Sequence, residues 1–128
     1  MGRKPDPQRR VALLSAFADY VLEHGLADLS LRPAAAALDT SPRMLLYHFG
    51  SKEELIVEAI AAIRARQTVF FAQEIGRHRR VPARPLENVG RLWRWYTLPK
   101  NESYSRLFYE VYGLAIKHPK RFGKFLEI

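Results

Sequence analysis

Apolar residues recur along this chain every three or four positions, the spacing that places side chains on one face of a helix. Residues 8–24 show this pattern first, and Gly25 follows as a stop signal. No segment shows the strict apolar and polar alternation of a half-buried strand. We therefore predict an all-α protein. The apolar stripe predicted for the first helix is Val11, Leu14, Ala18, Val21 and Leu22.

Two short helices are predicted next, one directly after the other. Ser30 is the expected N-cap of the second helix, which carries a proline in its first turn. Asp39 is expected to end that helix, because aspartate tolerates the left-handed conformation. Ser41 and Pro42 then supply the cap and the first residue of a third helix, which Gly50 ends. The two helices are thus separated by a turn of only three residues, Asp39-Thr40-Ser41.

Four further helices complete the predicted pattern. The sequence S-K-E-E at 51–54 is a capping box, which opens a long fourth helix that runs to about Gly76. Fifth and sixth helices are expected at 85–98 and 101–118, with Asn101 as the cap of the sixth, and 120–128 opens a seventh. Their predicted apolar positions are Leu55, Ile56, Ala59, Ile60, Ile63 and Phe70 in the fourth helix, Leu86, Val89, Leu92, Trp93 and Tyr96 in the fifth, and Leu107, Phe108, Val111, Tyr112 and Ala115 in the sixth.

The charge of the chain suggests a polyanionic partner, but its distribution is uneven. The net charge of the 128 residues is +8. Residues 1–66 hold nine Lys and Arg against eight Asp and Glu, whereas residues 67–128 hold twelve against five. Net charge describes long-range attraction and not a site, so the positions of the cations must decide where a polyanion binds. In the first half the cations are Arg3, Lys4, Arg9, Arg10, Arg32, Arg43 and Lys52, with Arg64 and Arg66 further on.

Several function classes find no support in the sequence. The chain has no cysteine, which excludes disulfides and thiolate metal sites and is compatible with a reducing cytoplasm. No window approaches the roughly 18 uninterrupted apolar residues of a membrane span, so we expect a cytoplasmic protein. The four histidines are scattered, and no HExxH motif, carboxylate pair or glycine-rich phosphate loop is present. We expect neither an enzyme nor a cofactor or metal.

The two short helices match a helix-turn-helix, in which the second helix enters the major groove of DNA. Leu45 and Phe49 lie four residues apart and are expected to pack inward, which leaves Arg43 and Tyr47 outside. Arginine offers a fork for guanine or phosphate, and tyrosine, histidine and lysine donate to phosphate oxygens. Lys52 stands at a helix N-terminus, which favours an anion.

Residues 9–56 resemble the DNA-binding domain of the TetR family of transcriptional regulators. The closest match is LLYHFGSKEELI, which is similar to the family's recognition-helix and fourth-helix signature. HGLADLSLR, with its Leu31-Arg32 entry to the second helix, supports the resemblance. The segment RLFYEVYGLAIKHPKRFGKFL would then belong to a regulatory domain. Two positions depart from the family pattern, since Asp39 replaces the usual glycine and Leu46 replaces the signature tyrosine, which is displaced to Tyr47.

The resemblance implies a role for each matching residue. Arg32 and Arg43 would read bases or phosphates. Tyr47, His48 and Lys52 would hold phosphates, although His48 fits a partly buried residue between helices almost as well. The phosphate contact that a tyrosine would make from position 46 is lost. The expected DNA-binding residues are Arg32, Thr40, Ser41, Pro42, Arg43, Met44, Tyr47, His48 and Lys52.

The second half concentrates aromatic residues on two predicted helices, which suits either a bundle core with an interface or an apolar ligand pocket with polar handles. The resemblance favours the pocket, for which we expect Trp93, Tyr96, Phe108 and Tyr112 to be ligand-binding residues. Family members usually continue through further helices that form most of the dimer interface, so the chain is expected either to be truncated or to form its dimer through other surfaces.

The expected organisation is a basic arm at 1–8, a three-helix helix-turn-helix domain at 9–56 and a helical ligand-binding and dimerisation domain at 57–128, joined by the long fourth helix. The arm is either a disordered tail or a minor-groove contact. The expected function is that of a homodimeric repressor that binds a palindromic operator in double-stranded DNA and is released by a small effector. The alternatives are a sequence-indifferent DNA-binding protein and a helical ligand- or partner-binding module with an inactive helix-turn-helix.

Overall fold

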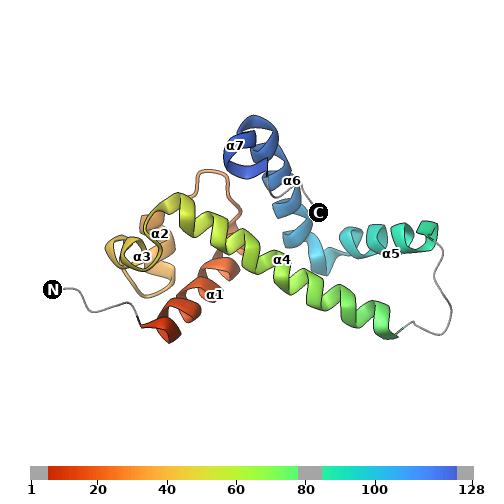
Figure 1. The fold of residues 1–128 in the computed structure, drawn as a ribbon, viewed down its shortest axis with the longest axis horizontal. Coiled ribbons are helices and arrows are strands. Elements are labelled where there is room, and N and C mark those ends of the chain that lie inside the picture. The colour runs from red at the N-terminus through yellow and green to blue at the C-terminus, as the bar shows by residue number, and fades with distance from the viewer. Residues whose placement is uncertain (1–5, 78–84, 124–128) are drawn as a thin grey trace. The chain divides into compact units, whose positions relative to one another are not determined.

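The computed structural model describes residues 6–77 and 85–123, and over these stretches it contains helices and no strands (Figure 1). This confirms the predicted all-α class. The chain divides into two compact units, Met1–Arg64 (unit 1) and Ala65–Ile128 (unit 2), and the division falls inside the long helix α4. The elements are α1 (Pro7–His24), α2 (Leu31–Ala37), α3 (Pro42–Phe49), α4 (Lys52–Arg77), α5 (Pro85–Thr97), the 3-10 turn η1 (Pro99–Asn101), α6 (Glu102–Lys117) and α7 (Pro119–Phe122).

The predicted helix boundaries agree closely with these elements. The predicted seventh helix is present as the short α7, and the remainder of its predicted range, 124–128, lies outside the described residues. Most of the basic connector RHRRVPARP also lies outside them, at 78–84. None of the described helices is both long enough and apolar enough to span a membrane.

The buried face of α1 is rotated about the helix axis relative to the predicted stripe. Ala18 and Val21 are buried as predicted, but Val11 is 67% exposed. Leu13 and Phe17 take its place in the core. The two sets share the helical period, so the spacing alone did not distinguish between neighbouring faces. The core of unit 1 is completed by α2, α3 and α4 through Ala34, Ala35, Leu45, Phe49, Leu55, Ala59, Ile60 and Ile63.

The turn between α2 and α3 is a Schellman motif built on an aspartate. Asp39 has φ of 56°, in the left-handed region. Its N–H donates to the carbonyl of Ala36 at 3.2 Å, and the N–H of Thr40 donates to the carbonyl of Ala35 at 2.9 Å. These two bonds satisfy carbonyls that the end of α2 would otherwise leave unpaired. The predicted left-handed aspartate is thus confirmed.

Serine side chains begin the next two helices as predicted. Ser41 Oγ accepts the N–H of Met44 at 3.1 Å at the start of α3, and Ser51 Oγ accepts the N–H of Glu54 at 3.1 Å at the start of α4. Between them Gly50 has φ of 88°, a conformation that glycine adopts without strain. The chain therefore stops one helix and starts another within two residues.

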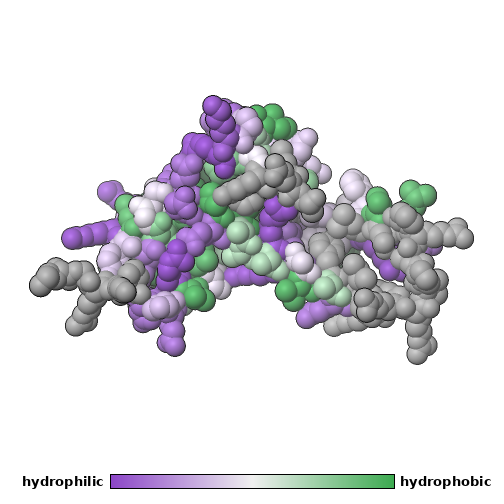
Figure 2. Space-filling view, viewed as in Figure 1, coloured by the Kyte–Doolittle hydropathy of each residue, from purple (hydrophilic) through white to green (hydrophobic). Residues whose placement is uncertain are grey.

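In unit 2 the aromatic residues are arranged differently from the prediction. Trp95 is buried in α5, and the centre of its ring lies 5.6 Å from that of Phe70 and 5.5 Å from that of Tyr104. Trp93 is 66% exposed, and Val89 and Leu86 are exposed as well, which contradicts the predicted core face of this helix. Apolar side chains are visible at the surface over α5 (Figure 2).

In α6 too, some of the residues that were predicted to be buried are exposed. Leu107, Val111 and Ala115 are buried as predicted, whereas Phe108 and Tyr112 are about half exposed. All five positions belong to one broad apolar arc, and unit 2 itself covers only one side of that arc.

Asn101 precedes α6 as predicted but acts differently. Its side chain makes no capping bond to α6; instead Nδ2 donates to the carbonyl of Trp95 at 2.9 Å. Ser105 Oγ donates to the carbonyl of Tyr96 at 2.6 Å. Both bonds satisfy carbonyls at the end of α5, so they tie the start of α6 to that helix.

The aspartate of the α2–α3 turn generates a prediction. Asp39→Gly should raise the free energy of unfolding by about 0.5–1 kcal/mol, because glycine adopts φ of +56° without the strain of a Cβ. Asp39→Val should lower it by about 1–2 kcal/mol, since a β-branched residue is poorly tolerated there. Chemical denaturation of the three proteins measures both changes. Equal stability of the glycine and valine variants would contradict the assignment of this turn.

Candidate nucleic-acid interface

Helix α3 has one buried face and one exposed face. Leu45 and Phe49 are buried, as predicted. Arg43 is exposed, Leu46 is 40% exposed and Tyr47 is 45% exposed. The exposed side of this short helix therefore carries a guanidinium, an aliphatic group and a phenol. Together these groups can donate to base edges or phosphates and can contact a thymine methyl group.

The other predicted DNA-binding residues lie in α3 itself or in the elements that precede and follow it in the sequence. Arg32 lies exposed in the first turn of α2, and Lys52 lies exposed in the first turn of α4. Helix α2 packs against α3, so Arg32 is carried by the direct neighbour of the exposed helix. Intermediate exposure is found for Thr40, Ser41, Pro42 and Met44.

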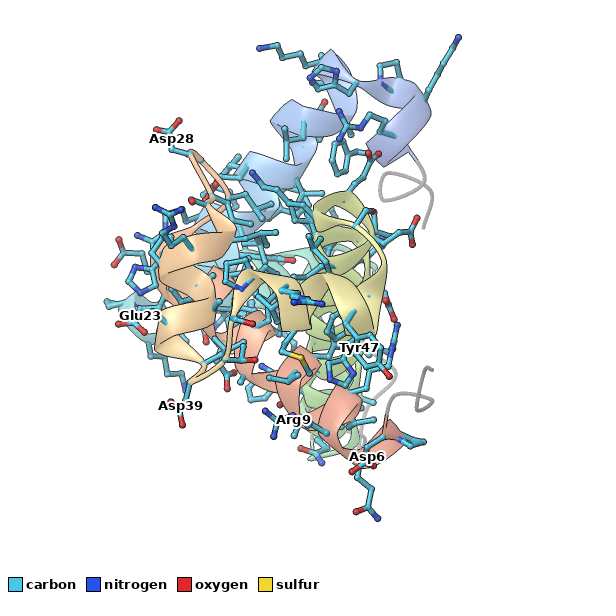
Figure 3. The ribbon with its side chains drawn as sticks, turned by 90° about the vertical axis from the view of Figure 1, so that its left-hand side faces the viewer. Asp6, Arg9, Glu23, Asp28, Asp39 and Tyr47 are labelled. Atoms are coloured by element: carbon cyan, nitrogen blue, oxygen red, sulfur yellow. The ribbon has the colours of Figure 1, made fainter. Side chains whose placement is uncertain are left out.

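Charged residues of both signs lie at the surface of unit 1. Figure 3 shows Tyr47, Arg9 and Asp6 toward one side of the view and Glu23, Asp28 and Asp39 toward the other. Arg9, like Arg43 and Lys52, is exposed. Arg43 thus places a cation on the exposed side of α3, although the net charge of the first half is close to zero. A local field of this kind attracts an anion regardless of the overall charge.

His48 lies on the inner side of α3. It is only 7% exposed, and neither ring nitrogen has a hydrogen-bond partner among the described residues. Its ring meets that of Tyr47 edge-on at 5.3 Å between centroids. The imidazole is therefore not presented at the surface with Arg43 and Tyr47.

Arg10, which the sequence analysis counted among the cations of the first half, makes contacts within unit 1. Its Nε donates to the carbonyl of His48 at 3.0 Å, and an NH2 nitrogen pairs with Glu58 Oε2 at 2.6 Å. Its guanidinium carbon lies 4.5 Å from the centre of the Phe49 ring. The helical period contains the signal that was missed, because Arg10 precedes the buried Leu13 by three residues and Phe17 by seven.

The residues predicted to bind a ligand lie on α5 and α6. The Tyr96 and Phe108 rings are 5.8 Å apart, and the Phe108 and Tyr112 rings are 6.4 Å apart and stacked. Trp93, as noted, is largely exposed. Three of the four residues thus form a continuous row of rings, and that row is open to solvent at Phe108 and Tyr112.

Comparison with known proteins gives one result. The family model of the bacterial regulatory proteins, tetR family, matches residues 13–59. No curated protein and no solved structure gives a significant match to the chain. The matched residues begin in the buried face of α1 and end in the first turns of α4, so they include both short helices, the Asp39 turn and the exposed side of α3. Residues 13–59 of this chain are therefore a TetR-family helix-turn-helix domain, the DNA-binding domain of a transcriptional regulator.

Proposed function

We propose that this protein is a ligand-responsive repressor that binds a palindromic operator as a homodimer and is released by a small apolar or amphipathic effector. The observation that carries the DNA-binding part is the exposed side of α3. An eight-residue helix presents Arg43, Leu46 and Tyr47 to solvent, while capping and buried residues hold it from behind. Side chains of this kind on a short capped helix suit the major groove.

Each residue has a proposed role that follows from its position. Arg43, in the first turn of α3, reads a base edge or phosphate, as N-terminal residues of a reading helix do. Tyr47 donates to a phosphate. Lys52 adds a cation at the N-terminus of α4, where backbone N–H groups also favour an anion. Arg32 contacts the backbone from α2. His48 needs a turned ring to join them, because its imidazole is buried.

The proposed effector response uses helix α4. This helix begins in unit 1 with Lys52 and continues into unit 2, where Phe70 packs against the ring of Trp95. An effector that binds better to one position of α4 than to another shifts the population toward that position. Operator affinity then falls by the differential binding energy, and the coupling is reciprocal. The row of rings Tyr96, Phe108 and Tyr112 is the proposed place for its apolar part.

Titration of labelled DNA tests the proposal directly. A palindrome from the promoter region of the gene should bind at least about 100-fold more tightly than a scrambled duplex at moderate salt. Arg43→Ala should weaken operator binding by roughly 10-fold or more, because a base or phosphate contact is lost. Lys52→Ala should weaken operator and scrambled DNA alike and lower the salt slope by about one.

The matched control is Arg94→Ala, which removes another exposed arginine, in α5. Its operator affinity should equal that of the wild type. Equal affinity of the wild type for operator and scrambled DNA would instead indicate sequence-indifferent binding, to which the basic second half of the chain would contribute. Unchanged DNA binding in both Arg43→Ala and Lys52→Ala would indicate an inactive helix-turn-helix.

Position 46 offers a gain-of-function test. Leu46 is 40% exposed on the side of α3 that carries Arg43 and Tyr47, so a longer polar side chain can be accommodated there. Leu46→Tyr should tighten operator binding by roughly 3- to 10-fold, because it adds a phenolic donor for a phosphate. Leu46→Phe is the control, since it adds the ring without the hydroxyl. Equal affinities of the two variants would rule out a phosphate at this position.

The homodimer has its own test. Two reading helices must lie about 34 Å apart to enter successive major grooves on one face of DNA. Sedimentation of the purified protein should therefore show a species of twice 14.8 kDa at concentrations that saturate the operator. A monomer, alone and on a palindromic duplex, would contradict operator recognition by a dimer.

A further inference from the structure

We propose that Arg10, whose side chain is partly buried, is a positioning residue for DNA recognition that sets the orientation of α3, and that Glu58 holds Arg10 in place. The inference rests on the proposed DNA-binding function. It concerns one of the cations counted in the first half of the chain, and it assigns that side chain to the support of the reading helix instead of to DNA itself.

Arg10 joins three helices through one side chain. It projects from the first turn of α1 and donates through Nε to the carbonyl of His48 in α3, at 3.0 Å. A second nitrogen of the same guanidinium pairs with Glu58 of α4 at 2.6 Å. The guanidinium also lies over the ring of Phe49, 4.5 Å from its centre. The planar fork of arginine allows these contacts at the same time, which the single ammonium group of lysine does not.

The carbonyl that Arg10 binds is in the last turn of α3, where helix carbonyls lack intrahelical partners. The last four carbonyls of a helix have no intrahelical partner, and α3 ends at Phe49. Gly50 donates its N–H to the carbonyl of Leu46 at 2.8 Å, and Arg10 provides the partner for His48. A cation at the C-terminal end of a helix also interacts favourably with the helix dipole. Arg10 therefore fixes the end of α3 that the Ser41 cap does not reach.

A small rotation of α3 would disturb DNA contacts. His48 directly follows Tyr47 and lies five residues after Arg43, so all three move with the same short helix. Side-chain atoms at a radius of about 6 Å move by about 1 Å when the helix turns by about 10°. Hydrogen bonds to bases and phosphates tolerate only a few tenths of an ångström around 2.9 Å. Fixing the rotation of α3 is thus a requirement for base reading.

A rival explanation is that Arg10 contacts a phosphate directly. The two explanations predict opposite effects of Glu58→Gln. If Arg10 positions α3, the neutral amide holds the guanidinium less firmly and operator binding weakens. If Arg10 serves DNA directly, removal of the carboxylate frees a cation and removes a negative charge, so binding tightens.

The experiment measures operator affinity at several salt concentrations for the wild type, Arg10→Lys and Glu58→Gln. We expect roughly 10-fold weaker binding for Arg10→Lys and roughly 3- to 10-fold weaker binding for Glu58→Gln. The salt slopes should equal that of the wild type, because no phosphate contact is lost. Tighter binding of Glu58→Gln would overturn the proposal.

A matched variant distinguishes the positioning of α3 from a general effect of Arg10 on stability. Ala12→Gly weakens the same helix at an exposed position, two residues from Arg10 and therefore on a different face of the helix. All measurements are made well below the melting temperatures, and helix content is checked by circular dichroism. Ala12→Gly should keep wild-type operator affinity even when it lowers the melting temperature as much as Arg10→Lys does. An equal loss of affinity in both variants would show that Arg10 acts through stability alone.

Amide hydrogen exchange in the free protein tests the role of Arg10 independently of operator binding. The amides of α3 from Leu46 to Gly50 should exchange faster in Arg10→Lys and Glu58→Gln than in Ala12→Gly. Wild-type protein without operator preference would refute the proposed function and leave this result intact. Unchanged exchange at the end of α3 would refute the positioning role whatever the DNA measurements show.

Discussion

Helix α3 is too short to be stable by itself, so unit 1 must stabilise it through contacts from other elements. Isolated helices below about 12 to 15 residues are marginal in water, and α3 has eight residues. Its stability must come from its surroundings. The Ser41 cap, the buried Leu45 and Phe49, and the guanidinium of Arg10 supply three different kinds of support. This arrangement leaves the opposite side of α3 available to solvent.

The sequence predicted the element boundaries well because they depend on local chemistry. Proline, glycine, serine and aspartate act within a few residues of their own position, so Pro42, Gly50, Ser51 and Asp39 marked the helix ends correctly. The family resemblance was also confirmed, because its motif covers the same local features. The roles of individual residues toward DNA remain predictions, since contact with a partner is not a local property.

Predictions of buried faces failed where several faces of a helix were equally apolar. Val11 and Leu13 are both aliphatic, and only the packing of α1 against its neighbours decides which is buried. In α5 the two tryptophans are two residues apart, and the core takes Trp95. Arg10 and Asn101 show a related limit, because their partners, the carbonyls of His48 and Trp95, belong to other elements. The helical period places Arg10 on the buried face of α1, but it does not identify the carbonyl that a side chain of this kind binds.

The left-handed aspartate in the α2–α3 turn has an evolutionary consequence. Aspartate and glycine codons differ by one base, so a glycine at position 39 is a single point mutation away. Natural proteins are kept above a stability threshold and are rarely selected for the most stable choice at each position. The two Schellman hydrogen bonds form with aspartate in place. The turn is therefore a position where sequence can drift between residues of different intrinsic preference while the geometry of the helix pair is retained.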